Sequence, residues 1–281
     1  MGTSFGRGLL HLAAAVDSAA VDPAGADDAD AQVELVRLAE RGGLDFVTLA
    51  GEGTPPGLAA RALATTRRIG VVPVPGEGVA DVDPAHRGRT GVWADGGARG
   101  TPPRAGAAAG GGGSAPAPPV RVVDATAPGA RAAAARYADV AVVRVADAVQ
   151  AGIVRDELRE RAAGLGRDPD GLRVLAGLLV DLGDGEYAAE PGHGGGGPRP
   201  TVHGPLYRGG PVDLAELIAV WHKDGAVDGF HCVPVAPRRD LERLVNGTVA
   251  LLQHRGLFRT FYPGSTLREH LGLRPLVPTP H

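Results

Sequence analysis

The chain has 281 residues and a formal net charge of −3, which gives no electrostatic reason to expect a nucleic acid or an anionic membrane surface as a partner. Cys232 is the only cysteine, so no internal disulfide can form, and no apolar run approaches the roughly 18 residues of a membrane-spanning helix. We therefore expect a cytoplasmic protein, and the length fits one barrel domain covering residues 1–281.

Short apolar segments alternate with helix-like segments along the chain, which favours a parallel α/β fold. The apolar runs are nearly continuous, as expected for strands that are covered by helices on one face and packed on the other. Eight such strands close a (β/α)₈ barrel of the TIM type. The predicted strands cover residues 9–16, 44–50, 69–74, 90–94, 120–125, 139–145, 172–182 and 229–235.

Helix boundaries are marked by glycines and by capping residues. The apolar stripe of residues 33–41 should end at Gly42, because glycine commonly follows the last turn of a helix. Asp213, with Glu216 three residues later, matches a capping box and predicts a helix that begins after Asp213. Asp240 is predicted to cap the last long helix.

Glycine and proline are abundant, with 44 and 24 residues, and they concentrate in two segments, 96–119 and 191–200. Such segments cannot bury enough apolar surface to offset chain entropy, so we expect flexible loops within the barrel domain. The first segment stands where a helix should follow the fourth strand, and residues 75–89 leave little room for a helix after the third. The barrel is therefore predicted to have shortened third and fourth connections.

Several segments follow one another in an order that is more specific than any one of them. ERGGLDFVTL (residues 40–49), RRIGVVPV (67–74) and PVRVVDATAPGARAAAARYADV (119–140) precede the strand GFHCVPVAP (229–237) and the tail RGLFRTFYPGSTLREHLGL (255–273). This ordered set resembles the luciferase-like monooxygenases, in the branch that includes nitrilotriacetate and dibenzothiophene-sulfone monooxygenases.

The resemblance implies a flavin-dependent monooxygenase or oxidoreductase that uses reduced FMN and O₂ on a small organic substrate. A separate flavin reductase would supply the reduced FMN, and a deazaflavin is the alternative cofactor. No metal is expected and no catalytic residue is assigned. The family site lies where the strands end, which implies cofactor contacts from residues at these positions: Asp17, Gly51, Glu52, Val74, Asp124, Ala125, Thr126 and Arg144.

Some of these positions differ from the residues that are usual in the family. Val74 stands where hydroxyl side chains are usual, and Asp124 puts a negative charge beside the turn that would hold the flavin phosphate. Segment 96–119 replaces a region that supplies aromatic and histidine contacts. The alternative interpretation is a catalytically degenerate barrel that acts as a partner subunit or as a small-molecule binding protein, and a homo-oligomer is left open.

Histidines offer further candidates, each with a structural alternative. His11 is more easily explained as a hydrogen-bonded core residue than as a catalytic base, and Asp17 fits either a ligand contact or a turn cap. His231 and Cys232 are adjacent on a predicted strand, so their side chains should point to opposite faces and cannot share a metal ion. In the tail, arginines alternate with aromatic residues over 255–268, which favours packing over the barrel or at a subunit contact.

Overall fold

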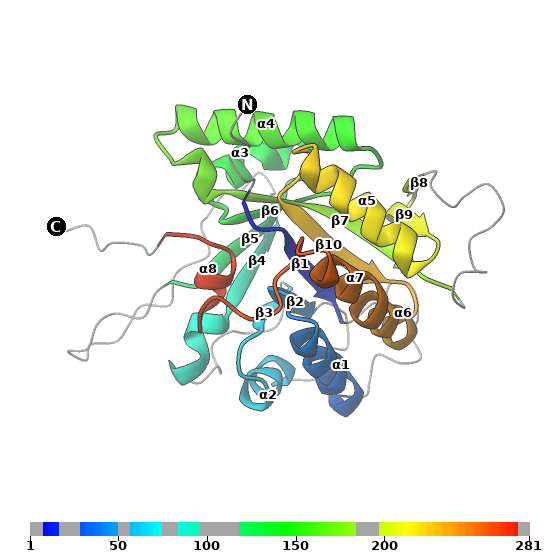
Figure 1. The fold of residues 1–281 in the computed structure, drawn as a ribbon. Helices are drawn as coiled ribbons and strands as arrows, with labels where there is room; N and C mark the ends of the chain where they lie inside the picture. The colour runs from blue at the N-terminus through cyan, green and yellow to red at the C-terminus, as the bar shows by residue number, and fades with distance from the viewer. Residues whose placement is uncertain are drawn as a thin grey trace.

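The computed structural model describes residues 8–16, 29–49, 57–74, 84–95, 118–183 and 197–274. In this part of the chain eight parallel strands form a sheet in the order β3-β2-β1-β10-β7-β6-β5-β4, which is the order of a barrel (Figure 1). A parallel bridge between Val71 and Thr90 joins β3 to the start of β4, so the ring is nearly closed. The predicted (β/α)₈ barrel is therefore confirmed.

Seven of the eight strands lie within a segment predicted from the sequence, and β4 extends one residue beyond the predicted segment 90–94. Their bounds are β1 His11–Ala15, β2 Phe46–Leu49, β3 Gly70–Pro73, β4 Gly91–Asp95, β5 Val120–Asp124, β6 Val140–Val143, β7 Arg173–Asp181 and β10 Gly229–Pro234. The apolar runs form these strands because both faces are covered, by helices outside and by packed side chains inside.

Helices surround the sheet on its outer face (Figure 1). Their bounds are α1 Ala29–Arg41, α2 Leu58–Thr65, α3 Pro128–Tyr137, α4 Ala148–Gly164, α5 Pro211–Lys223, α6 Pro237–Arg243 and α7 Ala250–His254, with a π-helical turn, Leu244–Val249, between α6 and α7. None of the described helices combines the length and the apolarity needed to cross a bilayer. Gly43, with φ of 76°, follows the end of α1 as the glycine pattern predicted.

Two predicted helix caps are wrong. Helix α5 begins at Pro211, so Asp213 lies inside the first turn. Helix α6 begins at Pro237, and buried Asp240 accepts a hydrogen bond from the backbone N–H of Ala236 at 2.7 Å instead of capping the helix itself. In both cases the proline sets the start, because its fixed φ suits the first helical position and its missing N–H has no partner there anyway.

The connections include a hairpin that the sequence did not predict. Strand β8 (Arg199–Thr201) pairs antiparallel with β9 (Gly204–Arg208), and β9 extends the sheet beside the end of β7. Residues 199 and 200 therefore belong to a strand, which corrects their assignment to the loop 191–200. Residues 191–196 lie outside the described part of the chain.

The shortened connections are described only in part. Before β4 the described residues form a 3₁₀ helix, η3 (Pro84–Arg89), in place of an α-helix. Of the predicted loop 96–119, residues 96–117 lie outside the described part of the chain. The reduced third connection is thus seen in residues 84–89, and the fourth stays a prediction.

Alternation along the strands separates inside from outside. Val140 and Val142 of β6 point into the barrel, whereas Ala141 and Val143 pack against α3 and α4. The interior is a packed core, as is usual for a barrel of eight strands. Its buried apolar residues along the strands are Ala13, Phe46, Val72, Trp93, Val120, Val122, Val140, Val142 and Leu175.

The C-terminal tail closes the barrel at the amino ends of the strands. Helix α8 (Leu267–His270) places Leu267 against the interior, with Leu271 and Leu273 beside it. A Cβ atom added at Gly70 would lie 2.7 Å from Cδ1 of Leu267, so this close approach depends on glycine. The tail therefore packs on the barrel, one of the two roles that its sequence pattern favoured.

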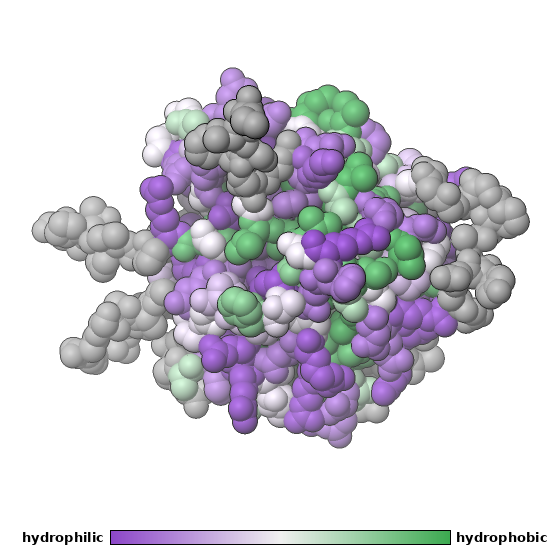
Figure 2. All heavy atoms as spheres, in the orientation of Figure 1, coloured by the Kyte–Doolittle hydropathy of each residue, from purple (hydrophilic) through white to green (hydrophobic). Residues whose placement is uncertain are grey.

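The outer surface shows no single large apolar area on the face seen in Figure 2, where apolar side chains lie in separate areas among hydrophilic ones. Val149 and Ile153, 74% and 64% exposed, are neighbours on one face of α4. Single exposed apolar side chains are normal on a monomer. A homo-oligomer stays a prediction.

Candidate active site at the carboxyl ends of the strands

Five inward-facing side chains gather near the carboxyl ends of the strands. We call them the mouth cluster: Thr48 of β2, Trp93 of β4, Asp124 of β5, Arg144 after β6 and His231 of β10. For Thr48, Asp124 and Arg144 the residue two positions earlier belongs to the interior core, so these side chains also point inward. Trp93 itself belongs to that core, and His231 lies beside Trp93. Active sites of barrel enzymes form at this end.

His231 forms the deep part of the mouth cluster. Its Nε2 lies 2.9 Å from Oγ1 of Thr48, and both residues are less than 5% exposed. The imidazole ring lies 6.3 Å from the ring of Phe46 and 5.9 Å from that of Trp93. Burial, together with nearby Arg144, lowers the pKa of His231 to about 4. The ring is therefore neutral at physiological pH and can donate or accept a hydrogen bond without carrying charge.

Asp124 and Arg144 form the shallower part. Arg144 Nη1 lies 3.2 Å from Asp124 Oδ2, and the two side chains are 42% and 23% exposed. The second carboxylate oxygen of Asp124 accepts a hydrogen bond from the N–H of Thr126 at 2.9 Å. The Thr126 hydroxyl in turn accepts the N–H of Arg144 at 3.1 Å. These contacts tie the turn after β5 to the end of β6.

The turn after β5 leads directly into α3. Ala127 is its N-cap residue and provides no side-chain cap, and Pro128 occupies the first turn. A Cβ atom added at Gly129 would meet nothing within 4 Å, so the start of the helix is open. The amino end of a helix favours negative charge. An anion near Thr126 would meet this helix end and the guanidinium of Arg144.

The predicted cofactor contacts are placed unequally. Asp124, Thr126 and Arg144 come together at the mouth, and half-buried Val74 follows β3 and packs against the interior core. Ala125 faces outward among residues packed on α3, and its N–H is bonded to the carbonyl of Val142. These five assignments remain predictions. Three further predicted contacts, at positions 17, 51 and 52, lie outside the described residues.

The grouping of Thr48, Trp93 and His231 is not evident from the sequence. The prediction that His231 and Cys232 point to opposite faces of their strand is confirmed, because Cys232 packs outside the barrel and His231 lies beside Trp93. A signal was available, because Thr48 and His231 are polar residues near the ends of otherwise apolar strands, on the inward alternation. Their proximity required the register of β1, β2 and β10, which the sequence does not show.

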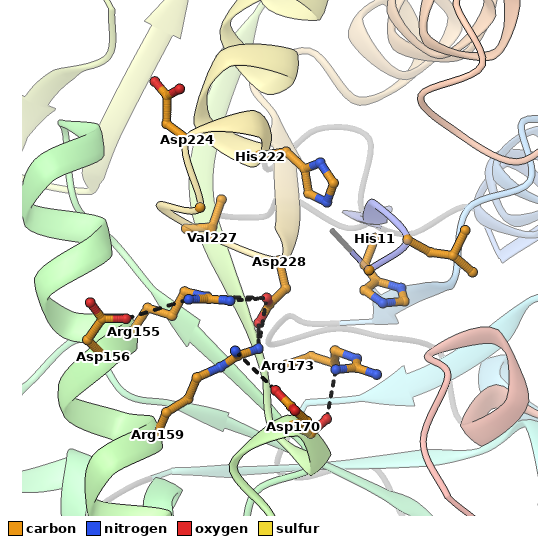
Figure 3. Close-up of a pocket in the computed structure, with 13 residues that line it drawn as sticks. His11, Arg155, Asp156, Arg159, Asp170, Arg173, His222, Asp224, Val227 and Asp228 are labelled. Carbon is orange, nitrogen blue, oxygen red and sulfur yellow. Dashed lines mark hydrogen bonds and ion pairs between the residues drawn. The ribbon is translucent and has the colours of Figure 1, made fainter. Parts of the chain in front are cut away.

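A crevice of about 530 Å³ lies at the opposite, amino end of the strands (Figure 3). Arg155 and Arg159 reach from α4 to the carboxylate of Asp228, at 3.1 and 3.0 Å. Burial alone would raise the pKa of Asp228, but the two guanidinium groups and the N–H of Val174 outweigh it and lower this pKa below its usual value.

The arginines of this crevice are bound within the protein. Arg173 donates to the carbonyl groups of Leu271 and Gly272 at 2.8 and 3.0 Å and thereby holds the tail under the barrel. His11 at the same end lies 3.2 Å from buried Asp45, which confirms it as a hydrogen-bonded core residue. These groups connect helices, strands and tail, a stabilising role that is usual at this end of a barrel.

Solved structures share the barrel architecture described above. EDTA monooxygenase from Chelativorans sp. BNC1 matches with a TM-score of 0.74 and 17% identity over 96% of this chain and 100% of that chain. The long-chain alkane monooxygenase LadA matches with a TM-score of 0.68 and 16% identity, covering 94% and 96%. At these identities the likeness concerns the fold.

Sequence similarity to curated proteins is local but strong. The chain is 45% identical over 65 residues to nitrilotriacetate monooxygenase component A of Aminobacter aminovorans, which is 23% of this chain and 14% of that protein. It is 40% identical over 72 residues to N-acetyl-S-(2-succino)cysteine monooxygenase of Bacillus subtilis, 26% of this chain and 16% of that protein. No family model matches the chain. The chain thus spans only a small part of the length of these relatives, and what it shares with the luciferase-like monooxygenases is a local sequence similarity and the barrel fold.

Proposed function

We propose that the chain is a flavin-dependent monooxygenase or oxidoreductase that uses reduced FMN and O₂ on a small organic substrate. The observation that carries this proposal is the mouth cluster, a set of polar and aromatic side chains facing inward at the carboxyl ends of a luciferase-like barrel. The relatives found by sequence are named as monooxygenases, which supports the same reaction type. The aligned segments are short, so the substrate of each relative stays a property of that relative.

The chemistry of the described residues supports a flavin as the cofactor. Arg144, the Thr126 hydroxyl and the open start of α3 offer a cation and hydrogen-bond donors to its phosphate. Trp93 and His231, which are 8% and 4% exposed, form an apolar, aromatic floor beneath the mouth, where the ring system would lie. When bound, the reduced flavin supplies the electrons and the reaction with O₂.

The chain's own residues would bind the substrate, orient it and exclude water. Neutral His231 is held by Thr48, so it can hold a substrate or cofactor oxygen by a hydrogen bond without adding charge. Phe46 and Trp93 surround it and keep bulk water away. Exclusion of water strengthens each hydrogen bond made there.

A deazaflavin is the alternative cofactor. The coenzyme F420-dependent tetrahydromethanopterin reductase of Methanopyrus kandleri matches this barrel with a TM-score of 0.62 and 12% identity. With FMN, the proposal includes a separate flavin reductase as a partner. With a deazaflavin, hydride transfer would replace oxygenation.

A second function follows from how the polar groups are used. In the described residues of the mouth, Asp124 is paired with Arg144 and Thr48 with His231, and His231 is neutral at physiological pH. A mouth whose polar groups satisfy one another favours ligand binding over proton transfer. This supports the alternative of a degenerate barrel that acts as a binding protein or partner subunit.

Anaerobic titration with reduced FMN, oxidised FMN and a deazaflavin tests the proposal. We expect one of them to bind with a Kd below about 10 µM, roughly −7 kcal/mol. Folded protein that binds none of them would rule out the flavin enzyme. Incorporation of an oxygen atom from O₂ into an added substrate, measured with a flavin reductase on protein that does bind, separates the enzyme from the degenerate barrel.

The two tryptophans provide a matched pair of reporters for the same titration. Trp93 lies in the mouth cluster, whereas Trp221 packs outside the barrel on Phe230 with ring centroids 5.7 Å apart. Bound flavin should quench the W221F variant, which retains Trp93, more strongly than the W93F variant. Equal quenching would place the flavin elsewhere.

A further inference from the structure

Arg144 is a cation held in position by glycines on neighbouring elements. A Cβ atom at Gly177 of β7 would lie 3.1 Å from Cγ of Arg144, and one at Gly204, at the start of β9, would lie 3.4 Å from its Cδ. Gly204 has φ of 122°, which L side chains rarely adopt. The aliphatic part of Arg144 is therefore packed by the barrel and by the hairpin, while the side chain as a whole stays 42% exposed at the mouth.

Asp124 partly neutralises this cation from inside the protein. One carboxylate oxygen lies 3.2 Å from Arg144 and the other is bonded to the N–H of Thr126. The carboxylate thus sits beside the amino end of α3, where negative charge is favoured. A phosphate has more charge and more acceptor oxygens than a carboxylate, so it is a stronger partner for the same guanidinium.

We propose that Asp124 and Arg144 form an exchangeable anion subsite. Asp124 holds Arg144 while the mouth is empty, and the phosphate at the ribityl end of the flavin displaces it when the cofactor binds. This inference rests on the proposed function. Asp124 thereby competes with the ligand, so removal of its charge should strengthen binding, whereas removal of the Arg144 charge should weaken it.

The experiment compares FMN with riboflavin, which lacks only the phosphate. Both flavins are photoreduced and titrated anaerobically at fixed ionic strength into the wild type, Arg144→Met, Arg144→Lys and Asp124→Asn. Methionine preserves an unbranched apolar stem between the glycines, and lysine restores a charge. Asparagine still offers an oxygen to the N–H of Thr126. Circular dichroism and tryptophan emission confirm that each variant is folded.

We expect the wild type to prefer FMN over riboflavin by about tenfold or more. R144M should reduce this preference to about one while riboflavin affinity stays unchanged, and R144K should restore part of it. D124N should increase the preference several-fold. Added inorganic phosphate should weaken FMN binding to the wild type and leave riboflavin binding unchanged.

Two results would overturn the inference, and they differ in what they say about the flavin. If the wild type binds FMN and riboflavin equally, or if all variants keep the wild-type preference, the subsite is wrong and flavin binding stands. If folded wild type binds neither flavin, the proposed function fails, and the subsite fails with it.

Discussion

The side chains of Asp45 and Arg259 meet at 2.9 Å although they lie 214 residues apart in the chain. Asp45 is fully buried beneath β1 and β2, where its other oxygen accepts the N–H of Leu12 at 2.8 Å and His11 lies 3.2 Å away. Burial by itself would raise the pKa of Asp45, but His11 and Arg259 outweigh it and lower this pKa. One arginine of the tail thus compensates a carboxylate inside the barrel.

Replacement of Arg259 should destabilise the fold strongly. In Arg259→Met the buried carboxylate loses its cation, which costs about 3–5 kcal/mol for pairs of this kind. The free energy of unfolding from urea titrations measures the loss. Arg238→Met is the matched control, because Arg238 is 70% exposed in its pair with Glu242 and its removal should change stability by less than about 1 kcal/mol. Similar losses in both variants would contradict a structural role specific to Arg259.

Stability should depend on pH through His231. Burial lowers its folded-state pKa to about 4, against the ordinary value of 6.5. Between these values the unfolded chain binds more protons, so this contribution is complete above about pH 6.5 and is lost as the pH falls toward 4, up to about 3 kcal/mol.

Comparison with His231→Gln isolates this effect, because the amide does not titrate. Burial also lowers the pKa of His270, which gives both proteins a slope of the same sign that cancels in the difference. The difference in unfolding free energy between wild type and variant, measured in urea at several pH values, should shrink from pH 7.5 to pH 4.5. A difference that does not vary with pH would refute the depressed pKa.

Two glycine-to-alanine substitutions should have opposite effects. A Cβ atom at Gly229 of β10 would fall on the carbonyl group of His11, its register partner on β1. Backbone atoms cannot move aside cheaply, so Gly229→Ala should cost about 3 kcal/mol. Gly164 ends α4 with nothing within 4 Å of its added Cβ, so Gly164→Ala should be neutral or stabilising by about 0.4–1 kcal/mol. The midpoints of urea unfolding of the two variants measure these effects. Equal shifts of the midpoint from the wild-type value would refute the close packing at Gly229.

The thiol of Cys232 should be unreactive in the native protein. It is 1% exposed on the outer side of β10, and burial raises its pKa to about 12. The thiolate is the reactive form, so alkylation at pH 8 should wait for opening of the barrel. Because Cys232 is the sole cysteine, mass spectrometry reads its labelling directly. Native labelling as fast as in urea would contradict the burial, and G229A should label faster than wild type.

The barrel was predictable because its strands carry a strong local signal. Apolar runs such as residues 139–145 are needed wherever a strand is covered on both faces. Helix starts were less predictable, because Pro211 and Pro237 set them earlier than the aspartates did. The hairpin of β8 and β9 could not be predicted, because all three residues of β8, Arg199–Thr201, are exposed and form no apolar pattern.

The candidate site was predictable only as far as strand ends could be located. Asp124, Thr126 and Arg144 were predictable because the family resemblance implies contacts at strand ends, and these residues lie at the ends of two recognisable strands. Their contacts depend on the register between β5 and β6, in which Asp124 is paired with Val142. Val142 precedes Arg144 by two residues, so both point to the inner side of the barrel. Register is a property of the assembled sheet, and the glycines that accommodate Arg144 come from β7 and the hairpin.

The seal formed by Leu267, Leu271 and Leu273 has a consequence for how the molecule is made. This segment follows all eight strands in the chain, and ribosomes deliver it only after the ring can already assemble. Until then the underside of the interior stays open to water, and Asp45 lacks its arginine. A nascent barrel would therefore have all eight strands before its interior is covered, and the exclusion of water from that interior would wait for this segment to be synthesised.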